Sequence, residues 1–191
     1  MAASSRRVPG FLKFFGLISL AVGWITIFIS MALNPWFSIA KNALSDMGAL
    51  GAEYAYVFNS GLFVAGVLAL FYSIYLLSEY DGRISALASS MFFFSAVHLI
   101  LIAVFPEGTY PHLLVSYEFF IWAGVAVLVF GIAFLAGGRL KLGSLFTVLS
   151  LIGFILAAVI PWPSIASLEI FSICILTIWV ALMLADHLRR G

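Results

Sequence analysis

The sequence predicts an all-α integral membrane protein, a bundle of six transmembrane helices. Of its residues, 64% are hydrophobic and only 9% are charged, which leaves too few polar groups to cover the surface of a soluble domain. Six continuous apolar stretches each approach the roughly 20 residues that a helix needs to cross a hydrocarbon core of about 30 Å. A membrane β-barrel is disfavoured, because its strands would alternate apolar and polar residues over about 10 positions.

The six apolar stretches define the expected helices and fill most of the 191 residues. They cover residues 11–33, 54–77, 84–105, 112–136, 144–160 and 164–185. The first stretch is too long for the apolar part of a secretory signal peptide, so we expect it to remain as a membrane span. The connections are short, and we therefore expect a single transmembrane domain over residues 1–191 with no soluble domain.

The basic residues predict how the chain is oriented in a cell membrane. Lys and Arg are retained on the cytoplasmic side during insertion, and an even number of spans places eight of the nine basic residues on one face. These eight are Arg6, Arg7, Lys13, Arg83, Arg139, Lys141, Arg189 and Arg190. Only Lys41 falls on the opposite, outer face. We therefore expect both termini to be cytoplasmic.

Two of the outer turns are similar in sequence. Residues 35–40 and 161–166 are identical at five of six positions, and a third turn, residues 106–112, also begins with a proline. A proline cannot continue a helix, so each turn ends a span at the outer interface. The similarity predicts three helical hairpins that open outward. The alternative is that Pro and Trp are simply common at membrane interfaces.

The segment after the first span is expected to form a short amphipathic helix over residues 36–47. Its polar residues recur at helical spacing on one face, namely Ser38, Lys41, Asn42 and Ser45. Such a helix would lie flat on the outer surface of the membrane. Asp46 would then either cap the next element or project into the mouth of the bundle.

Ionisable residues of the later spans also gather near the outer surface. His98 lies about 10 Å below the outer end of the third span, and Glu118 about 9 Å below His112, at about 1.5 Å per residue. A carboxylate at that depth needs a partner, a proton or water, so we expect Glu118 to face the bundle interior. Its expected partner there is His98, Asn59 or Lys41. By contrast, Glu107 and Glu169 are expected to be solvated loop charges.

These positions predict an outward-facing polar cavity at the hairpin tips. Its candidate residues are Ser45, Asp46, Asn59, His98, His112, Ser116 and Glu118. Three interpretations are open: a hydrogen-bonded network that holds the helices together, a pocket for a lipid headgroup or small polar ligand, or a hydrolytic metal site. A metal site would use His98 and His112 with Asp46 or Glu118, which are ligand types that zinc accepts. No HExxH spacing supports it, and the sequence identifies no cofactor.

Several of these motifs resemble those of a known family. The stretch Leu44-Ser45-Asp46-Met47-Gly48-Ala49, the Asn59-Ser60-Gly61 start of the second span and the Pro106 to His112 turn are similar to the prokaryotic membrane family called domain of unknown function 998, which is common in archaea. The resemblance implies six helices and no established activity. A more distant similarity is to membrane hydrolases that include alkaline ceramidases, which use Ser, Asp and three His around zinc. This chain differs from them in helix number and histidine count.

The favoured function is therefore that of a polytopic membrane protein whose outer-leaflet pocket binds a lipid headgroup or small polar ligand. One alternative is a structural or accessory subunit of a membrane complex, with a protein partner or second copy covering the small residues Gly61, Ala65 and Ala69. Another is a membrane-embedded, metal-dependent lipid hydrolase. The sequence leaves open whether the protein is an enzyme. Membrane lipids are expected partners, and no segment resembles a nucleic-acid-binding patch.

Overall fold

The computed structural model describes residues 8–190, and this part of the chain forms six long helices and no strand. All six are long and apolar enough to cross a membrane, which confirms the predicted fold class. Two short 3-10 helices, η1 and η2, precede α1 and α2. The bounds are η1 Gly10–Phe14, α1 Phe15–Leu33, η2 Leu44–Gly48, α2 Ala55–Glu79, α3 Arg83–Val104, α4 His112–Ala136, α5 Leu140–Val159 and α6 Ile165–Arg190.

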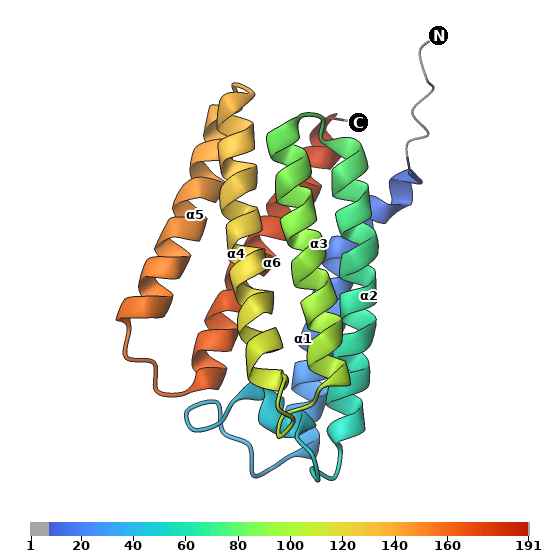
Figure 1. Cartoon of the computed structure of the whole chain (residues 1–191), viewed down its shortest axis with the longest axis vertical. Coiled ribbons are helices and arrows are strands. Elements are labelled where there is room, and N and C mark those ends of the chain that lie inside the picture. Colours follow the sequence, from blue (N-terminus) through green and yellow to red (C-terminus); the bar gives the residue numbers. More distant parts are fainter. Residues whose placement is uncertain (1–7, 191) are drawn as a thin grey trace.

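The two ends of the bundle differ in what they contain (Figure 1). The start of α1 and the end of α6 lie together at the top of the view, and the α1–α2, α3–α4 and α5–α6 connections lie at the bottom. We call the bottom of this view the outer end and the top the inner end. The inner end includes the basic residues Lys13, Arg83, Arg139, Lys141, Arg189 and Arg190. Arg6 and Arg7 lie outside the described residues.

Helices α1 to α5 pack in chain order, each against the next. Small residues allow the close approach that membrane helices need. Gly61 in α2 faces Thr26 of α1 so closely that a Cβ atom would have no room, and the Ser19 hydroxyl donates to the Ala65 carbonyl at 2.7 Å. Ala69 is buried in the core beside them. This run of small residues is therefore occupied by packing within the chain.

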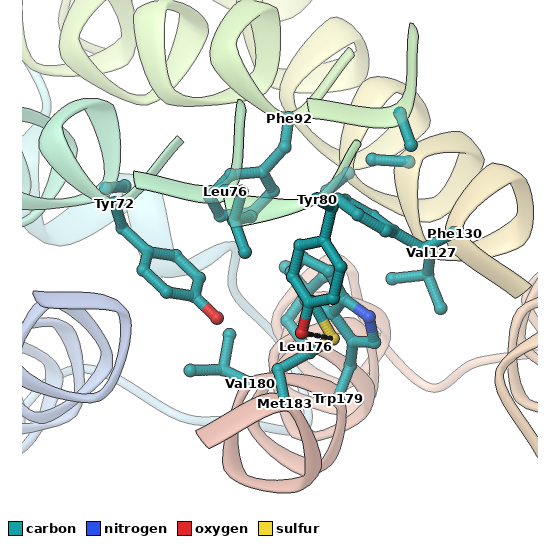
Figure 2. Packing of buried hydrophobic residues seen from close by; sticks show 14 of the residues in the cluster. Tyr72, Leu76, Tyr80, Phe92, Val127, Phe130, Leu176, Trp179, Val180 and Met183 are labelled. Carbon is teal, nitrogen blue, oxygen red and sulfur yellow. Dashed lines mark hydrogen bonds between the residues drawn. The ribbon is translucent and has the colours of Figure 1, made fainter. Parts of the chain in front are cut away.

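The inner half of α6 crosses the other helices and is held by aromatic packing (Figure 2). Trp179 is completely buried, and its ring lies 5.2 Å from Phe92 of α3, 5.6 Å from Phe130 of α4 and 6.4 Å from Phe146 of α5, measured between centroids. Aromatic pairs at such distances stabilise a core beyond the burial of their area. A single α6 side chain thus joins three helices.

A polar cluster closes the inner end around Asp186. Its carboxylate accepts from Arg139, between α4 and α5, and from Arg190 at 2.8 Å. The Arg190 guanidinium also donates to the Tyr80 hydroxyl at 2.8 Å, and that hydroxyl lies 3.3 Å from Nε2 of the buried His187. Burial raises the pKa of Tyr80, which keeps its hydroxyl protonated. The cluster ties the last turn of α6 to α2 and to the α4–α5 connection.

The expected amphipathic helix over residues 36–47 is wrong. Residues 34–43 form turns, and only η2 is helical in this segment. The reason is that polar side chains in this segment form hydrogen bonds with backbone amides that a helix would otherwise use. The Asn42 side chain accepts from the Ser38 amide at 2.9 Å, and Asp46 accepts from the Ala43 amide at 3.0 Å. Asp46 therefore caps the short helix that contains it.

The last two spans differ slightly from their predicted bounds. Helix α5 begins at Leu140, before the predicted residue 144, and α6 continues to Arg190, beyond the predicted residue 185. Both extensions lie at the inner end. Basic residues are favourable in the last turn of a helix because they complement its dipole, and here Arg190 also pairs with Asp186 four residues earlier. Charge thus lengthens α6 past its apolar part.

Replacement of Gly131 by alanine is expected to destabilise the contact between α4 and α5. A Cβ atom at this position would lie 2.7 Å from the Thr147 backbone nitrogen, which cannot move without shifting α5. Overpacking of this kind costs about 1–3 kcal/mol. The Gly131→Ala protein should therefore melt at a lower temperature in detergent than the wild type. Gly23→Ala is the control, because nothing lies within 4 Å of its Cβ position; equal melting temperatures for the two variants would contradict the packing described here.

Candidate functional site: a cavity at the outer end

A cavity of about 410 Å³ lies among the outer halves of α4, α5 and α6. It exists because α5 packs along α4 but makes few contacts with α6, although residues 160–164 join α5 directly to α6. The lower ends of α4 and α5 diverge in Figure 1. Cavities that bind small molecules commonly measure about 300–1,000 Å³, so this one is large enough for a ligand.

The cavity has apolar walls and a polar outer end. The walls are formed mainly by Leu113, Phe120, Ile121, Phe154, Ala157, Ala158, Ile165, Leu168 and Ile175. The polar residues near the outer surface are Ser45, Glu107, His112, Ser116 and Glu169. The hydroxyls of Ser150 and Ser172 lie deeper, but they donate to backbone carbonyls of Gly124 and Leu168. An amphipathic cavity of this form suits a ligand with one polar and one apolar part.

His112 is buried at the polar end of the cavity and begins α4. Its Nδ1 atom lies 2.8 Å from the Phe105 carbonyl, which can only accept, so Nδ1 carries a proton. Its Nε2 atom faces a Glu107 carboxylate oxygen at 3.0 Å and the Ser116 hydroxyl at 3.3 Å. A hydrogen bond between Nε2 and the Glu107 carboxyl group requires one further proton, held by either of the two groups.

Glu107 joins the α3–α4 turn to the outer loop that precedes α2. Its carboxylate accepts from the Ser45 hydroxyl at 3.3 Å, and its backbone carbonyl accepts from the Leu50 amide at 2.9 Å. The side chain is 41% exposed and lines the cavity. Glu107 is thus a partly solvated loop charge, as expected, but its carboxylate also bonds to His112 and Ser45 from two neighbouring segments.

Glu169 lies one turn into α6, also in contact with the cavity. Its carboxylate accepts a hydrogen bond from the Leu44 amide at 2.7 Å. This bond provides an acceptor for the first backbone N–H group of η2. Among residues 8–190, no Lys, Arg or His forms an ion pair with it. It also lines a smaller cavity of about 90 Å³ on the side of α1 and α2. Glu169 was expected to be a solvated loop charge, and this is wrong, because it lies in α6 and is only partly exposed.

The outer loop covers the polar end of the cavity. The Ala166 amide donates to the Asn42 carbonyl at 2.9 Å, and the Ser164 hydroxyl donates to the Ile39 carbonyl. The two turns with similar sequences, residues 35–40 and 161–166, are thus bonded to each other. The outer half of α6 is thus attached to the α1–α2 loop by hydrogen bonds, and Ala166 also packs in a small apolar cluster with Ile27 and Phe58.

His98 and Glu118 form a separate pair on the flank between α3 and α4. Their Nε2 and Oε2 atoms are 3.2 Å apart, and the Trp122 indole donates to the same carboxylate at 2.9 Å. The expected pairing of Glu118 with His98 is confirmed, but the Glu118 side chain is 38% exposed on this flank, so the expectation that it faces the bundle interior is wrong. Neither residue lines the cavity, because Glu118 follows Ser116 by two positions and points roughly 160° away from it around the helix.

The structure also places Asp46 and Asn59 outside the cavity. Asp46 bonds within its own loop, and the Asn59 side chain donates to the Gly48 carbonyl at 2.9 Å. Of the seven candidate residues, the structure brings together Ser45, His112 and Ser116 in the cavity. The proposed metal ligands His98, His112 and Asp46 each bond to a different partner. No group of three His, Cys, Asp or Glu residues within 8–190 could hold a metal ion.

These features define a polytopic α-helical membrane protein with an amphipathic cavity at one end of the bundle. The chain belongs to the family described as Protein of unknown function (DUF998), whose model matches residues 17–186. The family resemblance stated from the motifs is therefore confirmed. No curated protein and no solved structure matches the chain.

Replacement of Glu107 by alanine is expected to loosen the outer loop. The substitution removes the acceptor of the Ser45 hydroxyl, and one such hydrogen bond contributes about 1 kcal/mol, or roughly fivefold in local exchange rate. Hydrogen–deuterium exchange of the amides in residues 44–48 should therefore be faster. Glu53→Ala, an exposed carboxylate of the same loop, is the control. Unchanged exchange in Glu107→Ala would show that Glu107 does not hold this loop.

Proposed function

We propose that the protein binds an amphiphile in the outer cavity, with the polar group of a lipid or small polar ligand beside His112 and Glu169. The observation that supports this proposal is the combination of a polar end and apolar walls in one cavity of about 410 Å³. The polar residues face a ligand headgroup at the membrane surface, and the apolar walls between α4, α5 and α6 accept a hydrocarbon chain. Burial of that chain provides the favourable free energy.

The rim of the cavity supports entry of the ligand from the lipid phase. Large apolar side chains at this rim are highly exposed, with Leu113 at 61%, Tyr117 at 59% and Ile165 at 58%. In a bilayer such side chains contact acyl chains. The outer loop covers the polar end, so the route of lowest cost for an amphiphile is lateral, between the diverging ends of α4 and α5.

The alternative functions receive less support. The small residues Gly61 and Ala65, which an accessory-subunit role would offer to a partner, pack against α1 of the same chain. A metal-dependent hydrolase would need ligands that converge, and His98 and His112 bond to different carboxylates. We therefore propose ligand binding without assigning a reaction.

Filling the cavity is expected to abolish ligand binding. Ala158 on α5 lines the cavity, so an Ala158→Trp side chain would occupy space that a hydrocarbon chain needs. The test is to purify the protein in mild detergent and quantify the co-purifying lipid by mass spectrometry. We expect the wild type to retain a specific lipid, and Ala158→Trp to retain roughly tenfold less, which corresponds to a loss of about 1.4 kcal/mol.

Val159→Trp is the matched control for this experiment. Val159 is the next residue of α5, is 73% exposed and does not line the cavity, so the same bulk is added on the lipid-facing side. This variant should retain the lipid as the wild type does. Equal retention by Ala158→Trp and Val159→Trp would show that the cavity is not the binding site.

We also propose that the inner end faces the cytoplasm of a cell membrane, so that the cavity opens to the outer leaflet. The supporting observation is that Lys13, Arg83, Arg139, Lys141, Arg189 and Arg190 lie at or beyond the inner ends of the helices. A fluorescent reporter that folds only in the cytoplasm should be bright when fused after Gly191. Alkaline phosphatase, which is active only outside, should be inactive there and active when inserted at Lys41. The reverse pattern would overturn the orientation.

A further inference from the structure

The charge balance of the cavity distinguishes Glu169 from Glu107. Since Nδ1 of His112 is already protonated toward the Phe105 carbonyl, the proton between Nε2 and Glu107 makes either an imidazolium with a carboxylate or a neutral histidine with a carboxylic acid. In both cases the His112–Glu107 pair has no net charge. Glu169 forms no ion pair with any described residue, so its ionised form would place a negative charge at the polar end of the cavity that the described residues do not balance.

Within residues 8–190, no Lys or Arg side chain is available to neutralise Glu169. The outer end has one such residue, Lys41, which is exposed and does not line the cavity. The other Lys and Arg residues of the described chain lie at the inner end. An anionic headgroup would therefore meet the Glu169 carboxylate in a low-dielectric environment, where two like charges repel strongly.

From this charge balance we infer that the ligand has a cationic amine headgroup, with Glu169 as its counter-ion. The inference rests on the proposed binding function and specifies its chemical class. An ammonium group has three N–H donors and no acceptor. The polar end of the cavity offers matching acceptors, because the Glu169 carboxylate accepts only one hydrogen bond within the described chain, from Leu44, and Ser45 and Ser116 also line the cavity.

The structure also indicates where the rest of the ligand lies. Leu168 and Ile175 of α6 line the wall on either side of Ser172, and Phe120 and Phe154 line the opposing helices. These side chains form an apolar path that runs inward from Glu169. An amphiphile with one hydrocarbon chain can thus place its ammonium beside Glu169 and its chain along α6.

The experiment compares three probes that share one chain: octadecylamine, octadecanol and octadecanoic acid. Binding of each to the purified protein in detergent is measured by native mass spectrometry. We expect octadecylamine to bind at least tenfold more tightly than octadecanol, and octadecanoic acid to bind most weakly. In Glu169→Gln the amine should lose about tenfold in affinity while octadecanol is unchanged. The amide oxygen of the new side chain still accepts from the Leu44 amide, so the loop is retained.

Two control variants separate this inference from the proposed function. Glu118→Gln removes a carboxylate from α4 that lies outside the cavity, and it should keep the preference for the amine. If Glu118→Gln loses that preference as Glu169→Gln does, Glu169 is not the counter-ion. If the wild type binds all three probes equally and Ala158→Trp abolishes binding, the cavity stands and the cationic headgroup is wrong. If Ala158→Trp binds all three normally, the proposed function itself fails.

Discussion

The structure depends on the way α6 is attached differently at its two ends. At the inner end Trp179 packs between α3, α4 and α5, and Asp186 pairs with Arg139 and Arg190. At the outer end α6 is attached on one side only, by hydrogen bonds to the α1–α2 loop through Ala166 and Glu169 and by a small apolar cluster that Ala166 shares with α1, η2 and α2. Because α5 makes few contacts with α6, a space remains on the opposite side, among α4, α5 and α6. The cavity is the consequence of this asymmetry.

The polar groups of the outer end follow from the demands of the lipid environment. Hydrocarbon offers no hydrogen-bond partners, so polar side chains at this depth must bond to one another or line a cavity. On the α3–α4 flank, His98, Glu118 and Trp122 bond to one another. The His112–Glu107–Ser116 cluster combines both, since its members bond to one another and still face the cavity. Glu169 also lines the cavity, but it bonds to a backbone amide and to no other ionisable side chain of the described chain.

The candidate site was predictable in part. The free-energy cost of placing a carboxylate within the membrane was enough to indicate that Glu118 needs a partner, and His98 is that partner. The same cost applies to Glu169, which lies one turn inside an apolar helix, so its position was a signal for a cavity residue. Glu107 offered no such signal, because it lies in a turn. Its role became visible only when the loop before α2 was placed beside it.

By itself the sequence determined the class of protein, the number of spans and the family, because apolar length and short motifs are local properties of the chain. It also indicated which polar residues lie near the outer end. Only the tertiary structure decided which of them share a cavity. That depends on the rotation of each helix about its axis and on the divergence of α5 from α4, and both are set by contacts between residues far apart in the chain, such as Trp179 with Phe92.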